Sequence, residues 1–234
     1  MRWPATTLSL MVTLAAAAPD EAHADGPAAP TPQADATLSR LESAQGSPIT
    51  WNDVPAGRAE HFGHSEVLVG APLPYVREQA LDFAHYREFS GGRIRTSRVV
   101  DKQAQSTDVY LQVPVLHGMV MLWEVLRFSD VRRAADGTES FAGHLVSGNV
   151  QSAEMQITMR PVGSGRTVLR CDLHVAPKFA APQSAVDAEL RDAAESAVVA
   201  LRERAEAKYG QTAPRPNADL VADHEARESL DAGK

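Results

Sequence analysis

The chain has 234 residues, of which 44% are hydrophobic and 23% are charged, and its formal net charge is −7 at pH 7. This composition is typical of one soluble globular domain, and the acidic balance offers no basic surface for nucleic-acid phosphates. The single cysteine, Cys171, excludes an intrachain disulfide and a cysteine-rich metal site. Its strand-like, alternating surroundings favour a packed thiol over a reactive one.

The first 24 residues have the pattern of a secretory signal peptide. Arg2 supplies a positive charge, residues 8–18 form an apolar run, and an Ala-His-Ala cleavage motif ends at Ala24. The apolar run is shorter than the roughly 20 residues that span a bilayer. We therefore expect residues 1–24 to be removed near Ala24 and the mature protein to be exported, either periplasmic or extracellular.

The segment 25–63 is expected to be a linker and an N-terminal arm. It begins with a stretch rich in proline and alanine, which is typical of a linker. Two helical turns are predicted at 36–44, and Trp51 follows, so we expect the arm to dock this tryptophan on the domain. The folded domain is expected over 64–210, and the polar tail 211–234 is expected to be disordered.

Periodicity divides the expected domain into a mixed first part and a long β region. A strand is predicted at 65–71, followed by short helices at 75–83 and 85–89. Six further strands follow at 94–102, 107–115, 119–132, 139–147, 151–162 and 166–176. Because short turns connect these strands, neighbours should pair antiparallel.

A long amphipathic helix is predicted at 184–209. Apolar residues recur there at steps of three and four, and Gly210 provides the expected stop. The apolar face is narrow and consists mainly of alanine and valine. Such a helix can lie close to a sheet, or it can form one wall of a space that it does not fill.

The element order predicts an α+β fold in which a curved antiparallel sheet of about seven strands wraps around the C-terminal helix. Local patterns agree with this arrangement over about residues 65–209. They are a strand and proline at 67–72, a helix with a Tyr-x-x-Phe segment at 76–89, a strand at 97–100, a strand–proline–glycine hairpin at 159–167, and Pro177 with the alanine-rich helix.

Together these patterns resemble the START-like, or SRPBCC, superfamily with its helix-grip fold, nearest the polyketide cyclase and coenzyme Q-binding type. The chain departs from the family pattern in the sixth strand, where Ile157 or Met155 replaces the usual tryptophan. The resemblance implies a binding site for an apolar or amphipathic small molecule between sheet and helix. A minority of members act as cyclases, hydrolases or dehydratases, and fold alone does not separate these uses.

The first functional hypothesis is an exported, non-enzymatic binding or transport protein for a lipid, quinone or polyketide-like hydrophobe. No cofactor, metal or nucleic acid is expected, and a transient membrane contact stays an open alternative. The expected ligand-binding residues are Val109, Leu111, Val113, Leu122, Glu124, Leu126, Ile157, Met159 and Leu173 on the sheet, and Leu190, Ala194, Val198 and Leu201 on the helix.

The orientation of Glu124 depends on the register of one hairpin. A two-residue turn at 117–118 pairs Leu111 with Glu124. The same register sets Asp108 opposite Arg127, a cross-strand charge pair that supports it. Glu124 then points inward, where burial would raise its carboxyl pKa. A shift of one residue turns Glu124 outward, so the sequence leaves both orientations open.

The second hypothesis is a cyclase- or hydrolase-type enzyme that uses Glu124 with His144. Counting from a turn at 136–137 places His144 outside, whereas counting from a turn at 148–149 places it inside. At least one β-bulge is therefore required, and the orientation of His144 stays open. The sequence contains no G-x-S-x-G nucleophile motif and no glycine-rich phosphate loop.

Overall fold

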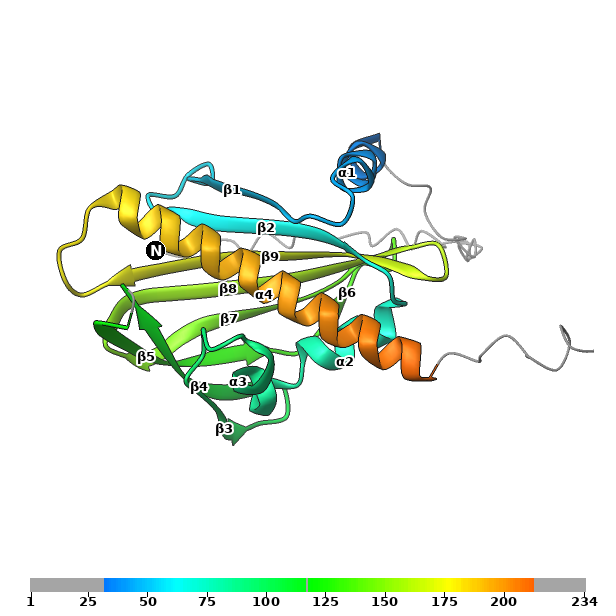
Figure 1. Cartoon of the computed structure of the whole chain (residues 1–234). Coiled ribbons are helices and arrows are strands. Elements are labelled where there is room, and N and C mark those ends of the chain that lie inside the picture. Colours follow the sequence, from blue (N-terminus) through cyan, green and yellow to red (C-terminus); the bar gives the residue numbers. More distant parts are fainter. Residues whose placement is uncertain (1–31, 117, 213–234) are drawn as a thin grey trace, which may run out of the picture.

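The computed structural model describes residues 32–116 and 118–212 (Figure 1). The predicted signal peptide, the start of the linker and the tail from residue 213 lie outside the described residues. One curved antiparallel sheet forms the body of the domain, and a long helix crosses its concave face. The α+β, helix-grip arrangement expected from the sequence is confirmed.

Nine strands and five helical segments make up the described chain. They are α1 (Pro32–Ser43), β1 (Ile49–Asp53), β2 (Phe62–Val69), α2 (Leu73–Ala80), the 3-10 turn η1 (Phe83–His85), α3 (Tyr86–Phe89), β3 (Thr96–Lys102), β4 (Ser106–Val115), β5 (Val120–Ser129), β6 (Arg132–Arg133), β7 (Glu139–Gly148), β8 (Val150–Val162), β9 (Arg166–Pro177) and α4 (Gln183–Thr212). The sheet order is β1-β2-β9-β8-β7-β5-β4-β3, and the short β6 pairs with β7. Strands β1 and β6 account for the difference from the seven that were expected.

The N-terminal arm is part of the sheet. Strand β1 pairs with β2, and the Trp51 ring stacks on His64 with 5.0 Å between the ring centroids. The Arg170 guanidinium lies 5.1 Å from the centroid of the Trp51 ring. The Asn52 amide also donates to the carbonyl of Asp187 in α4, at 2.9 Å. The arm therefore docks through Trp51, as expected, and the sheet begins before the expected domain boundary at residue 64.

Helix α4 lies unusually close to β2 because of one glycine. A Cβ atom at Gly63 would lie 2.4 Å from the backbone carbonyl carbon of Leu190. Further along β2, Val67 and Val69 are fully buried in the core beneath the helix. The helix also continues past Gly210 to Thr212, whose hydroxyl contacts Lys208 and Tyr75, so this glycine does not stop it.

The β4–β5 register is the one that turns Glu124 inward. Leu111 pairs with Glu124, and Asp108 pairs with Arg127. Arg127 donates two hydrogen bonds to the Asp108 carboxylate, at 2.7 and 2.8 Å. Glu124 is 6% exposed, whereas its neighbour Trp123 is 37% exposed on the outer face. Of the two registers that the sequence left open, the one that the charge pair supports is therefore correct, and the one shifted by a residue is wrong.

The bulge that the turn spacing required lies between β5 and β7. Val125 pairs with Ser147 and Leu126 with Leu145, so Val146 is an extra residue. On the far side of this bulge His144 pairs with Arg127 and is exposed on the outer face of the sheet. The orientation counted from the 136–137 turn is therefore correct, and the one counted from the 148–149 turn is wrong.

Aromatic side chains fill one end of the space between the sheet and α4. The rings of Phe83 and Phe128 stack with 4.6 Å between centroids, and Phe141 meets both edge-on. Tyr86 packs against Phe83, and its hydroxyl donates to the Ala80 carbonyl at 2.5 Å. These four rings pack this end of the core.

Candidate ligand-binding site

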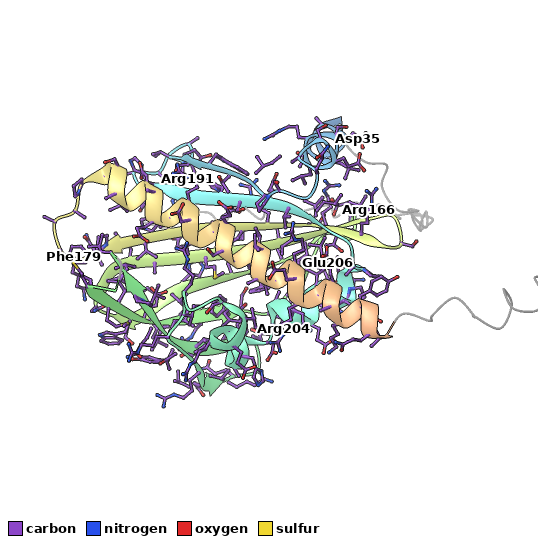
Figure 2. The ribbon with its side chains drawn as sticks, viewed as in Figure 1. Asp35, Arg166, Phe179, Arg191, Arg204 and Glu206 are labelled. Atoms are coloured by element: carbon purple, nitrogen blue, oxygen red, sulfur yellow. The ribbon has the colours of Figure 1, made fainter. Side chains whose placement is uncertain are left out.

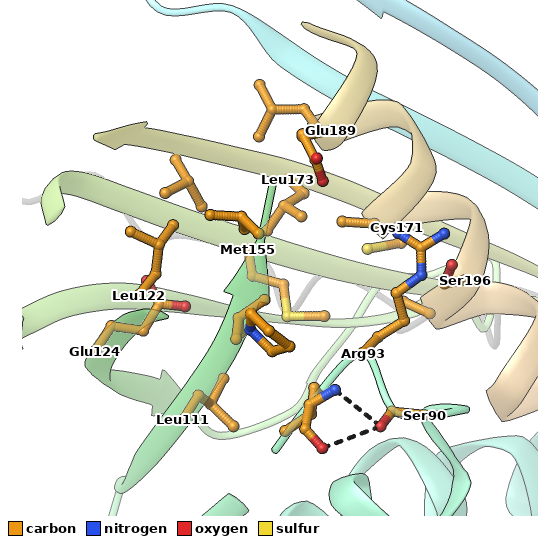
Figure 3. Close-up of a pocket in the computed structure, with 18 of the residues that line it drawn as sticks. Ser90, Arg93, Leu111, Leu122, Glu124, Met155, Cys171, Leu173, Glu189 and Ser196 are labelled. Atoms are coloured by element: carbon orange, nitrogen blue, oxygen red, sulfur yellow. Dashed lines mark hydrogen bonds between the residues drawn. The ribbon is translucent and has the colours of Figure 1, made fainter. Parts of the chain in front are cut away.

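A cavity of about 200 Å³ lies between the sheet and the N-terminal two-thirds of α4 (Figure 3). Its walls come from the α3–β3 segment, from β4, β5, β8 and β9, from the β9–α4 loop and from α4. The strand residues that line it are Leu111, Val113, Pro114, Val115, Leu122, Glu124, Leu126, Met155, Cys171, Leu173, Val175 and Pro177. Almost all of them are apolar, as expected for a site that holds a hydrophobic molecule.

The cavity exists because α4 presents small side chains to it. Ala193, Ala197 and Ala200 follow one another at steps of four and three, which places them on one face of the helix. A methyl group reaches much less far toward the sheet than a leucine side chain, so this stretch of helix closes the space without filling it. Leu190 and Leu201 limit the alanine face at either end.

One rim of the cavity is a glycine turn that carries Arg93. Gly91 and Gly92 have φ angles of 61° and 87°, a left-handed conformation that glycine adopts without strain. The Ser90 hydroxyl accepts a hydrogen bond from the Ile94 amide at 3.0 Å and closes the turn. Figure 3 shows the Arg93 side chain extending from this turn toward α4. The sequence analysis did not identify Arg93, because no periodic pattern locates the end of a loop side chain.

The opposite rim is formed by the loop between β9 and α4 and by the start of that helix. Phe179 lies in this loop at the end of the molecule, beyond the last strand (Figure 2). Ala181, Ala185 and Glu189 continue the rim onto α4. In the part of the chain that the structure describes, neither Glu189 nor Arg93 has a side-chain hydrogen bond or ion pair. The rim therefore carries one free carboxylate and one free guanidinium.

Glu124 is the ionisable side chain of the deep wall. It lies on the cavity floor with Leu122, and its cross-strand partners are Leu111 on β4 and Gly148 on β7. Its Oε2 atom is buried and has no hydrogen-bond partner among the described residues. Burial away from water raises the pKa of this carboxyl to about 7. A fraction of the molecules therefore keep the proton near neutral pH.

Known proteins provide a comparison for this architecture. No family model matches the chain, and no curated protein matches it. Solved structures do match its fold. A STAR-related lipid transfer protein from Xanthomonas axonopodis superposes with a TM-score of 0.58 at 16% identity, over 68% of this chain and 93% of that chain.

Two human structures agree with it. STARD10 gives a TM-score of 0.57 at 13% identity, over 79% of this chain and 82% of that one. StAR-related lipid transfer protein 5 gives a TM-score of 0.56 at 12% identity, over 75% of this chain and 95% of that one. The chain has the START-like, helix-grip fold. At these identities the likeness concerns the fold, and the START-like resemblance inferred from the sequence is confirmed at that level.

The cavity is lined by eight of the thirteen residues that were predicted from the sequence to bind the ligand. They are Leu111, Val113, Leu122, Glu124, Leu126, Leu173, Leu190 and Leu201. The other five, Val109, Ile157, Met159, Ala194 and Val198, are not among the lining residues and lie in the buried core. Alternation had already identified Leu173 on β9, and the same rule would have added its neighbours Cys171 and Val175.

The proposed catalytic pair is not brought together. Glu124 lines the cavity, whereas His144 is exposed on the outer face, because the bulge at Val146 changes the phase of β7. A shared active site for these two residues is therefore ruled out. Among the described residues, no three His, Cys, Asp or Glu side chains form a group that could hold a metal ion. No described helix is long and apolar enough to cross a membrane.

Proposed function

We propose that the protein is a non-enzymatic carrier or scavenger that holds one hydrophobic small molecule between its sheet and α4, and that it acts after export. The observation that carries the proposal is the cavity itself, which has apolar walls, one buried polar group and a rim that opens to solvent. Two proteins of similar fold are named as lipid transfer proteins, which supports the same use here. The signal-peptide pattern of residues 1–24 supports export.

The size of the cavity narrows the ligand class. A volume of about 200 Å³ lies below the roughly 300–1,000 Å³ of typical drug-sized sites. The ligand is therefore compact, or it leaves a polar portion at the rim near Arg93 and Glu189. Lipids, quinones and polyketide-like molecules with a small buried portion satisfy this condition, because the apolar portion gains by leaving water.

Uptake from a mixture tests the proposal directly. Protein purified from the periplasm of a bacterial host is stripped of bound lipid, incubated with an extract of lipids and quinones, and examined by native mass spectrometry. We expect a one-to-one adduct, and we expect the protein mass to lack residues 1–24. A protein that takes up nothing from the extract would overturn the carrier proposal, and an uncleaved mass would overturn export.

Two alanines on α4 provide a matched pair of substitutions. Ala197 lines the cavity, so Ala197→Phe should fill it and remove most of the adduct while the unfolding midpoint changes little. Ala194 is fully buried against the core and does not line the cavity, so Ala194→Phe should destabilise the fold by about 1–3 kcal/mol or more through overpacking. Adduct intensity and urea denaturation, measured on both variants, check the contrast. Equal losses of stability in both would mean that α4 covers a solid core.

A further inference from the structure

Among the described residues that line the cavity, Glu124 is the buried carboxyl group, and its Oε2 atom has no hydrogen-bond partner. Arg93 and Glu189 lie at the rim of the cavity. The Tyr86 hydroxyl donates a hydrogen bond to a backbone carbonyl, and the Cys171 thiol is fully buried. None of these groups forms a hydrogen bond or ion pair with Glu124. On the neighbouring strands it faces Leu111 and Gly148, which carry no charge.

A comparison with the other buried glutamate shows what is missing. Glu139 also has one buried, unpartnered oxygen, but its Oε1 accepts hydrogen bonds from Arg77 and Arg133 at 2.9 and 2.5 Å. Glu139 lies outside the cavity, and its arginines explain its burial. Glu124 has no such arginine. A buried polar group without a partner costs free energy, and the Glu124 side chain lines the cavity.

We propose that the ligand inserts an uncharged oxygen acceptor, such as a ketone or quinone carbonyl, into the cavity first and receives a hydrogen bond from the protonated carboxyl of Glu124. This inference rests on the proposed function and specifies its ligand class. The neutral carboxyl is the form that an apolar cavity favours, and it supplies one O–H donor. A carbonyl oxygen can accept the hydrogen bond from this O–H group without bringing a charge into the cavity.

Charged ligand ends fit this position less well. A carboxylate would meet a carboxyl group in an apolar wall, because Arg93, the cation among the described lining residues, lies at the rim. An ammonium group would require the ionised carboxylate, and both charges would then have to leave water. An anionic end is better placed near Arg93, which orients a bifunctional ligand with its uncharged oxygen inside.

Because the proposed hydrogen bond requires the protonated carboxyl of Glu124, the affinity for the ligand should depend on pH. If only the protonated form binds and the free carboxyl has a pKa of about 7, the dissociation constant should rise about tenfold between pH 6 and pH 8. Any apolar molecule that covers Glu124 also disfavours its charge, so the pH dependence alone does not decide the proposal. The decisive quantity is the affinity ratio between matched ligands with and without the oxygen.

Three naphthalenes provide this comparison. The probes are 2-acetylnaphthalene (ketone), 2-ethylnaphthalene (hydrocarbon) and 2-naphthoate (carboxylate), titrated calorimetrically at pH 6 and pH 8. At pH 6 we expect the ketone to bind about three- to tenfold more tightly than the hydrocarbon, the value of one neutral hydrogen bond. Glu124→Leu should abolish this ratio, and Glu124→Gln should keep most of it without the pH dependence. Glu195→Gln, which removes a glutamate of α4 that does not line the cavity, should behave like the wild type.

The outcomes separate this inference from the proposed function. A ketone-to-hydrocarbon ratio that is the same in the wild type and in Glu124→Leu would overturn the inference and leave the carrier proposal intact. If 2-naphthoate bound at pH 8 as tightly as the ketone, the inference would also be overturned and the carrier proposal would stay intact. Failure of all three probes in a protein that still takes up compounds from the extract also counts against the inference. Absence of any uptake from the extract counts against the proposed function.

Discussion

Replacing Glu124 by glutamine should increase the free energy of unfolding at pH 8 by up to about 3 kcal/mol and change it little at pH 4. Burial raises the pKa of this carboxyl from 4.5 to about 7 in the folded protein. A raised carboxyl pKa means that the folded state binds more protons than the unfolded state, so stability is present below pH 4.5 and is lost as the pH rises through 7. A shift of this size corresponds to about 3 kcal/mol.

Urea denaturation of both proteins at pH 4, 6 and 8 measures this effect. The difference between variant and wild type should grow with pH over the window from about 4.5 to 7 and then become constant. Glu195→Gln, which removes a glutamate of α4 outside the cavity, serves as the control for loss of a charge. A Glu124→Gln difference that does not change with pH would show that the Glu124 carboxyl ionises in the folded protein at no cost in stability.

Replacing Gly63 by alanine should lower the free energy of unfolding by about 3 kcal/mol or more. The added Cβ would lie 2.4 Å from the Leu190 carbonyl carbon and 2.6 Å from the Arg191 amide nitrogen. Both are backbone atoms, so no side-chain rotation relieves the contact and α4 must move away from β2. The lifted helix would also widen the cavity, since Leu190 lines it.

Thermal unfolding followed by circular dichroism checks this prediction, with Gly210→Ala as the control. Gly210 lies inside α4 and a Cβ there has no neighbour within 4 Å, so alanine should stabilise the helix by up to about 1 kcal/mol. The unfolding temperature is therefore expected to fall in Gly63→Ala and to rise in Gly210→Ala. A Gly63→Ala protein that unfolds at the wild-type temperature would mean that the helix lies farther from β2 than the structure shows.

The sequence predicted the fold where local signals and long-range pairing agree. The Asp108–Arg127 pair and the expected turn at 117–118 favour the β4–β5 register that the structure has, although the sequence alone did not exclude a shift by one residue, and that register sets the orientation of Glu124. The position of the bulge at Val146, in contrast, could not be predicted from local signals. Which residue is extra depends on the hydrogen bonds of β7 to both of its neighbours, and turn spacing alone could only show that a bulge exists.

The cavity wall was predicted only in part, because the rotation of α4 about its axis is not encoded in its period. A three- and four-residue repeat identifies Ala194 and Val198 as apolar-face positions, but it cannot say whether they face the solid core or the open space. In the structure Ala193, Ala197 and Ala200 face the cavity instead. The aromatic cluster of Phe83, Tyr86, Phe128 and Phe141 fills one end of the core, and its rings come from four separate elements.

Contacts near both ends of α4 restrict how a ligand can enter the cavity. Near its start the helix is pressed against Gly63, and near its end Glu206 accepts a hydrogen bond from the Gly70 amide while Arg204 pairs with Asp82 (Figure 2). The span between Arg191 and Glu206, about 22 Å, is therefore fixed at two points. Since Asn52 also holds the first turn of α4 at Asp187, we expect a ligand to pass through the loop before the helix, around Phe179, and not beneath the helix itself.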